Sequence, residues 1–274
     1  MSVTSFRELH RPGEPFVLAN AWDLGSAKVL AALGAKALAT TSAGHAFTLG
    51  LKDMGEITRE QSLEHAGAMA KCTSLPVSGD LENGYGHGPE EVARTVKLAH
   101  QSGLAGCCIE DIRLPSAQPY EFAVSVARIE AAVETARQLV AKTGRDFVLT
   151  ARADGVMHGQ YDTNEAIRRL RAYEAAGADV LYAPMPPSMD ELARICRELS
   201  APVNALAAGS FASFSVGDFA NIGVARISLG SALARLTHAT LVNSARQFLE
   251  RGDFSSFREG MDGAKIEAMF DKSG

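Results

Sequence analysis

The sequence predicts an α/β protein built as a (β/α)8 TIM-type barrel. Three observations support this fold class: eight short apolar runs, an amphipathic stretch between most of them, and glycines that end several of those stretches. Eight strand–helix units in 274 residues are the size and number typical of a single closed parallel barrel.

The eight apolar runs are the expected strands, because short runs rich in Val, Ile, Leu and Ala are typical of parallel strands buried on both faces. In chain order they cover residues 16–21, 37–41, 76–81, 106–111, 147–152, 179–183, 203–207 and 226–230.

The stretches between the runs show helical spacing. A helix is expected over about residues 25–33, and apolar residues recur at steps of three and four at Val92, Val96 and Ala99. Glycine supplies a left-handed helix end before the next strand at Gly34, Gly103, Gly177 and Gly223.

Composition and charge limit the classes of protein to which this chain can belong. The chain has 46% hydrophobic residues, 22% charged residues and a net charge of -5, without a basic run, so a nucleic-acid partner is not expected. No apolar run is long enough for a membrane span, and the N-terminus has no signal-peptide core. The four cysteines show no disulfide or zinc spacing, which favours a cytoplasmic location.

No linker composition divides the chain, so residues 1–274 are expected to form one domain, with residues 252–274 as a C-terminal helical extension. Residues 241–250 are read as an amphipathic helix before it. The extension carries much apolar surface, which should pack on the barrel or on another subunit.

Polar residues gather where the expected strands end, which is the active-site end of a barrel. Asp80 and Glu82 end the third strand and share one face on an ideal strand, and Glu110 ends the neighbouring fourth strand. Three carboxylates without a cationic partner in their own segments predict a Mg²⁺ site, with Mn²⁺ as an alternative. The competing interpretation is that these acids form salt bridges or are solvated.

Four segments resemble the isocitrate lyase / phosphoenolpyruvate mutase superfamily, in its phosphonomutase-like group: GDLENGYG from Gly79, CIEDIRLP from Cys108, the TAR of Thr150–Arg152, and AGADVLYAP from Ala176. The resemblance covers about residues 16–236 in order and spacing. It implies a barrel that is usually a homotetramer (or dimer) with swapped C-terminal helices, and a site for Mg²⁺ and a small carboxylate substrate.

By motif match, the resemblance also implies roles for single residues. Asp80 would hold the metal directly, and Glu82 and Glu110 would act through water. Arg152 would bind and polarise a 2-oxo acid. Other expected contacts to the metal waters or the substrate are Asp53, Thr41 and Ser42.

The loop over residues 112–122 departs from the family pattern, because it has no Cys, Lys or His. This argues against isocitrate cleavage by the usual route, and Ser116 and Gln118 stand where the mutases carry Lys and Asn. Ser116, Gln118 and Tyr120 are therefore the candidate gating or proton-transfer residues of that loop. A His or Glu that some members use after the sixth strand is replaced near Pro184.

Further candidates follow from their places at the strand ends. Tyr85 is a candidate proton donor, Trp22 a candidate wall of the pocket, and Asn204 a candidate substrate ligand. Tyr182 and His45 are weaker candidates. Cys107 and Cys108 are expected to pack in the barrel, since a free cysteine behaves as a small buried hydrophobe.

The function predicted is a Mg²⁺-dependent enzyme that acts on a small 2-oxo acid through a metal-bound enolate and makes or breaks a C–C or P–C bond, as a lyase or phosphonomutase-like enzyme. One alternative is an oxaloacetate-type decarboxylase or hydrolase. Another is a non-catalytic protein that binds an oxo acid, and a weaker one is a purely structural oligomer.

Overall fold

The computed structural model describes residues 5–272, and its centre is a closed barrel of eight parallel strands in the order β1-β10-β9-β8-β7-β4-β3-β2. The strands are β1 (Phe16–Asn20), β2 (Leu38–Ala39), β3 (Val77–Asp80), β4 (Gly106–Ile109), β7 (Val148–Arg152), β8 (Val180–Tyr182), β9 (Val203–Leu206) and β10 (Arg226–Ser228). All eight predicted strands are confirmed, each ending within the predicted range.

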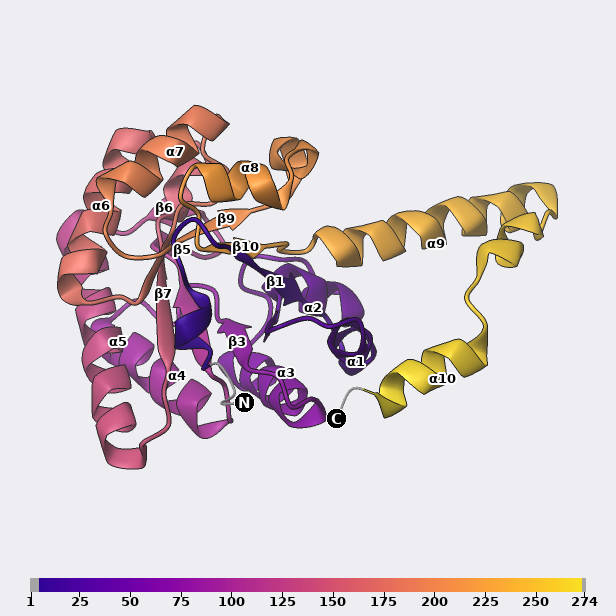
Figure 1. The fold of residues 1–274 in the computed structure, drawn as a ribbon, viewed down its shortest axis with the longest axis horizontal. Coiled ribbons are helices and arrows are strands. Elements are labelled where there is room, and N and C mark those ends of the chain that lie inside the picture. Colours follow the sequence, from indigo (N-terminus) through magenta and orange to yellow (C-terminus); the bar gives the residue numbers. More distant parts are fainter. Residues whose placement is uncertain (1–4, 273–274) are drawn as a thin grey trace.

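Helices surround the barrel on its outside (Figure 1). They are α1 (Leu24–Ala32), α2 (Ser42–Thr48), α3 (Arg59–Cys72), α4 (Pro89–Gln101), α5 (Phe122–Thr143), α6 (Thr163–Ala176), α7 (Met189–Glu198), α8 (Val216–Asn221), α9 (Ala232–Arg251) and α10 (Gly263–Asp271). Short 3-10 turns are η1 (Arg7–Leu9), η2 (Asp154–Val156), η3 (Gly209–Ser213) and η4 (Ser255–Glu259). The core lies between strands and helices, where the outward strand side chains meet the helices.

The loop after β4 is a small antiparallel hairpin that the sequence did not predict. Its strands are β5 (Ile112–Arg113) and β6 (Gln118–Pro119). Its base is fixed by the backbone N–H of Tyr120, which donates to the Asp111 carbonyl oxygen at 2.9 Å. The hairpin therefore stands at the same end of the barrel as the carboxyl ends of β3 and β4.

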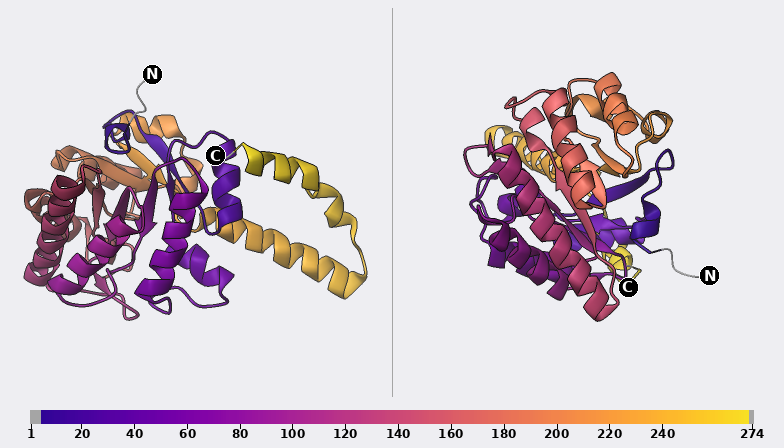
Figure 2. Two further views of the ribbon diagram at one scale, coloured as in Figure 1. Left: turned by 90° about the horizontal axis from the view of Figure 1, so that it is seen from below. Right: turned by 90° about the vertical axis from the view of Figure 1, so that its left-hand side faces the viewer.

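The C-terminal part leaves the barrel as an arm. Helix α9 begins nine residues before the predicted range of 241–250, projects away from the barrel, and is followed by η4 and by α10, which returns to pack on α1 (Figures 1 and 2). Large apolar side chains on α9 are exposed: Leu236 64%, Leu241 64%, Val242 45% and Leu249 77%. Within the described residues, none of the helices combines the length and hydropathy needed to span a bilayer.

Candidate active site at the barrel mouth

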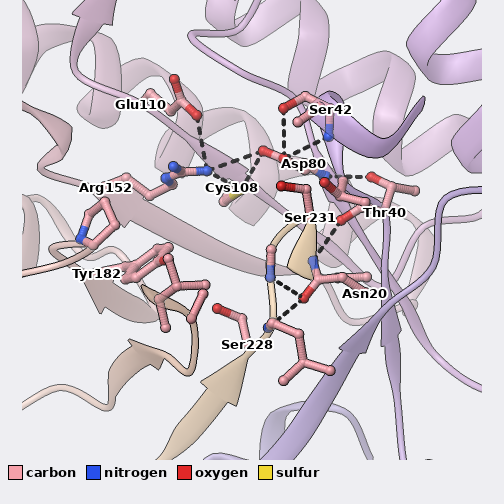
Figure 3. A pocket seen from close by; sticks show the side chains of 18 of the residues that line it. Asn20, Thr40, Ser42, Asp80, Cys108, Glu110, Arg152, Tyr182, Ser228 and Ser231 are labelled. Carbon is pink, nitrogen blue, oxygen red and sulfur yellow. Dashed lines mark hydrogen bonds and ion pairs between the residues drawn. The ribbon is translucent and has the colours of Figure 1, made fainter. Parts of the chain in front are cut away.

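A cavity of about 340 Å³ opens at the carboxyl ends of the strands. Its walls come from nearly every strand–helix connection, as the rule for barrel active sites requires. Eight of the predicted site residues line it: Thr41, Ser42, Asp53, Asp80, Glu82, Glu110, Arg152 and Asn204. Figure 3 shows several of them around the space between Arg152 and Ser231.

Asp80 ends β3 and receives donors from three directions. Its Oδ2 accepts the backbone N–H and the hydroxyl of Ser42, both at 2.9 Å, and its Oδ1 lies 3.2 Å from Arg152 Nη1 (Figure 3). Its own N–H donates to Thr40 Oγ1 at 2.7 Å. These bonds orient the Asp80 carboxylate, which shares the positive charge of Arg152 with Glu110 and Asp154.

Glu82 is held in an unusual position. Its φ of 48° lies in the left-handed region, which non-glycine residues rarely adopt. Its Oε1 accepts the N–H of Gly55 at 3.1 Å, whereas its Oε2 is buried without a partner among the described residues. Burial, with the charges of Asp80 and Asp53, raises the pKa of Glu82 to about 7.

Glu110 extends the acidic group from β4. Its Oε1 lies 3.0 Å from Arg152 Nη1 (Figure 3), and the backbone N–H of Glu110 donates to the Glu82 carbonyl oxygen at 2.9 Å. Burial raises the pKa of Glu110 well above its usual range, with the charges of Asp154 and Asp80 adding to the effect and Arg152 opposing it. The two glutamates are therefore costly to ionise together unless a further cation joins them.

The residues of this acidic group fit a hard divalent cation. The donors are carboxylate oxygens, and Glu82 Oε2 is an orphaned buried acceptor beside them. In the arrangement over residues 5–272, no three His, Cys, Asp or Glu side chains already surround one point closely enough to hold an ion. Arg152 Nη1 instead stands between Asp80 and Glu110, so direct coordination by all three predicted ligands is not formed here.

Arg152 is oriented from behind by Asp154. Its Nε and Nη2 donate to the two Asp154 carboxylate oxygens at 3.0 and 2.5 Å. The Asp154 N–H donates to Asp111 Oδ1 at 2.8 Å, and Asp111 Oδ2 accepts from Arg169 and Tyr161 at 3.0 and 2.7 Å. Burial alone would lower the pKa of Arg152, but the carboxylates of Asp154 and Glu110 outweigh it and hold that pKa above its ordinary value.

Several predicted substrate ligands have their polar atoms committed within the protein. Both Ser42 donors point at Asp80, and Thr41 Oγ1 accepts the N–H of Gly44 as the N-cap of α2. Asn204 is completely buried, donates to Ser228 Oγ at 2.9 Å and accepts from Arg226 Nε at 2.8 Å. Asp53 lines the cavity, and burial raises its pKa.

Four predicted residues do not line the cavity. Tyr85 packs on the core with its side chain hydrogen-bonded to Ser62 of α3, and burial raises its pKa. Trp22 lies against Gly44 of α2, where a Cβ would come 2.8 Å from the Trp22 Cβ. Ser116 and Gln118 are exposed at the hairpin tip, although Leu114 of the same hairpin does reach the cavity.

The structure also shows where the weaker candidates Tyr182 and His45, and the loop residue Tyr120, lie relative to the cavity. The ring of Tyr182 lines the cavity, 5.1 Å below the Arg152 guanidinium. His45 instead stacks on His65 at 3.7 Å, away from the cavity. Tyr120 is buried at the base of the hairpin, where its hydroxyl contacts Asn83 Nδ2 at 3.1 Å and His87 Nδ1 at 2.9 Å.

The structure also brings in residues that the sequence did not single out. The packing role expected for both cysteines holds for Cys107 only, because Cys108 faces the cavity with its Sγ 3.4 Å from Asp80 Oδ1. Burial raises the pKa of Cys108 to about 12. His158, Arg226 and Arg235 line the cavity as well. In the sequence, only their positions could have marked them as site residues: His158 follows the fifth predicted strand, Arg226 begins the eighth and Arg235 follows it.

A family model described as phosphoenolpyruvate phosphomutase matches residues 6–249 of this chain. The chain belongs to this family. It is an enzyme of the isocitrate lyase / phosphoenolpyruvate mutase superfamily, as the sequence resemblance predicted.

Relatives and solved structures from the same superfamily support that placement. The chain is 31% identical to 2,3-dimethylmalate lyase of Eubacterium barkeri over 202 residues, which cover 71% of this chain and 67% of the relative. A solved structure from Burkholderia cenocepacia, described as a lyase/mutase, is 41% identical with a TM-score of 0.91, covering 98% of this chain and 95% of the other. Oxaloacetate acetylhydrolase solved with its product oxalate is 27% identical with a TM-score of 0.85, covering 98% and 93%.

Proposed function

We propose that this family member is a Mg²⁺-dependent enzyme that breaks or forms a C–C bond next to the carbonyl of a small 2-oxo acid. The observation that carries the proposal is the position of Arg152 Nη1, 3.2 Å from Asp80 and 3.0 Å from Glu110, with the opposite edge of the guanidinium fixed by Asp154. An acidic group and a fixed cation at one point suit a chelating oxo acid, whose carbonyl oxygen gains charge as the bond breaks.

The cation would be held by Asp80, with Glu82, Glu110 and Asp53 around it. When bound, the cation would supply Lewis-acid stabilisation of the negative charge that develops on the carbonyl oxygen of the substrate. Mn²⁺ has the same preference for oxygen ligands. Superfamily membership is consistent with the use of a divalent metal.

The protein's own contribution is orientation and exclusion of water. Asp154 presents Arg152 edge-on to the cavity, so that Nη1 can move from the two carboxylates to a substrate oxygen without reorienting the whole side chain. The Tyr182 ring lies under the guanidinium and closes that side with apolar surface. Arg152 would then stabilise the enolate oxygen in a site with few competing waters.

A C–C bond is favoured over a P–C bond by the names of the relatives. One relative is named as a dimethylmalate lyase and one as an oxaloacetate acetylhydrolase. A decarboxylase or hydrolase that acts on oxaloacetate is therefore included in the proposal, because it breaks the same type of C–C bond in a different substrate. A phosphonomutase is the second candidate, supported by the family model.

The test is NMR of the purified protein with Mg²⁺ and oxaloacetate, 2-methylisocitrate, isocitrate and phosphonopyruvate in turn. Product from one acid, abolished both by EDTA and by Asp80→Ala, is expected. Phosphoenolpyruvate formed from phosphonopyruvate alone would establish the mutase instead. Oxalate that binds equally well with and without Mg²⁺ would overturn the metal-site proposal, and Mg²⁺-dependent oxalate binding without any turnover would favour the binding protein.

We also propose that the protein is a homotetramer or dimer that exchanges its C-terminal helices. The exposed leucines of α9 support this, because an isolated projecting helix with such an apolar face gains stability by packing on another subunit. The partners proposed are thus a small carboxylate and further copies of this chain. Four free cysteines support a cytoplasmic location.

A further inference from the structure

We propose that His158 is the general acid–base residue of this site, in place of the missing Cys, Lys and His of the loop after β4. The inference rests on the proposed function. It names the group that exchanges a proton with the carbon next to the substrate carbonyl.

His158 lies in the connection between η2 and α6, directly beyond the β7 strand that carries Arg152. Among the described residues that line the cavity, it is the one histidine. The backbone N–H of His158 lies 3.4 Å from the carbonyl oxygen of Asp154. His158 therefore belongs to the same turn as Asp154, the residue that orients Arg152. The imidazole and the guanidinium therefore enter the cavity from one connected segment.

The turn behind His158 is tightly packed. A Cβ on Gly155 would come 2.1 Å from the Tyr161 ring, and the Tyr161 hydroxyl donates to Asp111 at 2.7 Å. The N–H of Gln160 closes the turn on the Gly155 carbonyl oxygen at 2.8 Å. The backbone of His158 is thus fixed by contacts on both sides, which is what a positioned proton-transfer group needs.

Both ring nitrogens of His158 are uncommitted within residues 5–272. This separates it from four of the other histidines of the chain, which hold ring hydrogen bonds or contacts: His10, His87, His100 and His238. The remaining two, His45 and His65, stack on each other outside the cavity. The half-buried imidazole of His158 lines the cavity and makes no hydrogen bond within the described part of the chain, so no structural bond accounts for a histidine at this position.

The other titratable groups of the cavity are poor candidates for the same task. The carboxylates of Asp80, Glu82, Glu110 and Asp53 are assigned to the cation, directly or through its waters, in the proposed site. Burial raises the pKa of Cys108 to about 12 and also raises that of Tyr182, so neither exchanges a proton readily near neutral pH. The hairpin after β4 contributes only the apolar Leu114.

The surroundings of His158, burial above all, favour the neutral form of its ring. Burial and Arg152 lower its pKa, and Asp53 and Asp111 from two other connections partly oppose them. When a C–C bond breaks beside the carbonyl, its electron pair enters the enolate and the carbon must gain one proton. The neutral His158 ring would take up a proton from solvent and pass it to that carbon, and in the reverse direction it would remove the proton and return it to solvent.

The test uses pyruvate in D2O with Mg²⁺, followed by the loss of its methyl proton signal. The wild type is expected to exchange these protons, and His158→Gln to exchange them about 100-fold or more slowly, while its Mg²⁺-dependent oxalate affinity changes less than about threefold. Added imidazole is expected to restore exchange to His158→Ala, because removal of the half-buried ring leaves space beside the cavity that a free imidazole can occupy. A merely structural role would show no such rescue.

His87→Gln is the matched control, since His87 is exposed and lies outside the cavity. Equal exchange by wild type and His158→Gln would overturn the inference, as would a wild type that binds oxalate with Mg²⁺ but exchanges neither pyruvate nor 2-oxobutyrate. Loss of Mg²⁺-dependent oxalate binding in the wild type is a different outcome, which overturns the proposed function itself.

Discussion

Asp154 and Arg152 meet edge to edge, with Nε–Oδ2 at 3.0 Å and Nη2–Oδ1 at 2.5 Å. Two parallel bonds fix the plane of the guanidinium, which a single bond would not do. They also leave Nη1 as the one nitrogen turned toward Asp80 and Glu110. The completely buried Asp154 therefore decides which edge of Arg152 the cavity receives.

Replacement of Asp154 tests this relationship. Asp154→Asn keeps the shape but removes the charge and one acceptor, so the Arg152 plane should be less well fixed. We expect Mg²⁺-dependent oxalate affinity, measured by calorimetry, to fall roughly 10- to 100-fold. Asp190→Asn, at an exposed position of α7, is the matched control and should leave it unchanged. Wild-type affinity in Asp154→Asn would show that Arg152 needs no support from behind.

Glu82 predicts how the stability of the metal-free protein depends on pH. Its folded-state pKa is raised from 4.5 to about 7, so its contribution to stability is full below about pH 4.5 and is lost as pH rises through 7. In EDTA, Glu82→Gln should therefore unfold at a higher temperature than the wild type at pH 8 and at a similar one at pH 5.

The control for this pH dependence is Glu130→Gln, at an exposed position of α5. It should follow the wild type at both pH values. Mg²⁺ should raise the melting temperature of the wild type at pH 8 more than that of Glu82→Gln, because the cation relieves the repulsion among the carboxylates. A difference between wild type and Glu82→Gln that is the same at pH 5 and pH 8 would contradict the raised pKa.

In the hairpin after β4, the base is held by the buried Tyr120, whereas the tip residues Ser116 and Gln118 are exposed. Tyr120→Phe removes the contacts of a buried hydroxyl with Asn83 and His87 and should lower the free energy of unfolding by about 1 kcal/mol, measured with urea. Ser116→Ala and Gln118→Ala should change it by less than about 0.5 kcal/mol, because both residues are exposed. If closure of the hairpin matters, these two should reduce turnover with oxalate affinity unchanged, and unchanged kinetics in both would exclude that role.

Helix α9 predicts the assembly. Leu241→Asp and Leu249→Asp place a charge on its exposed apolar face, where each leucine would otherwise contribute about 1.5–3 kcal/mol by burial. Both should shift the particle to a smaller mass in light scattering after gel filtration. Asn243→Asp adds the same charge at a polar exposed position and is the control. A monomeric wild type would contradict the proposed exchange of helices.

Much of the fold was predictable from local pattern. Runs of apolar residues with helical stretches between them indicated eight strands, and all eight are present. The polar strand ends also indicated where the site lies, because parallel strands bring all their carboxyl ends to one rim. The hairpin of β5 and β6 was missed, since two strands of two residues leave no periodicity to read.

Side-chain direction is what the sequence by itself could not determine. Alternation along β4 says that Cys107 and Cys108 face opposite ways, but only the closure of the barrel decides that Cys108 meets Asp80. Tyr85 looked like a site residue beside Glu82, yet at a φ of 59° it packs toward Ser62 instead. His158 and Asp154 lie in a connection whose path depends on hydrogen bonds that Asp154 and Tyr161 of this connection make with Asp111, 43 and 50 residues earlier in the sequence. The sequence thus determined the barrel and its acidic rim by local periodicity, whereas long-range packing decided which groups enter the cavity.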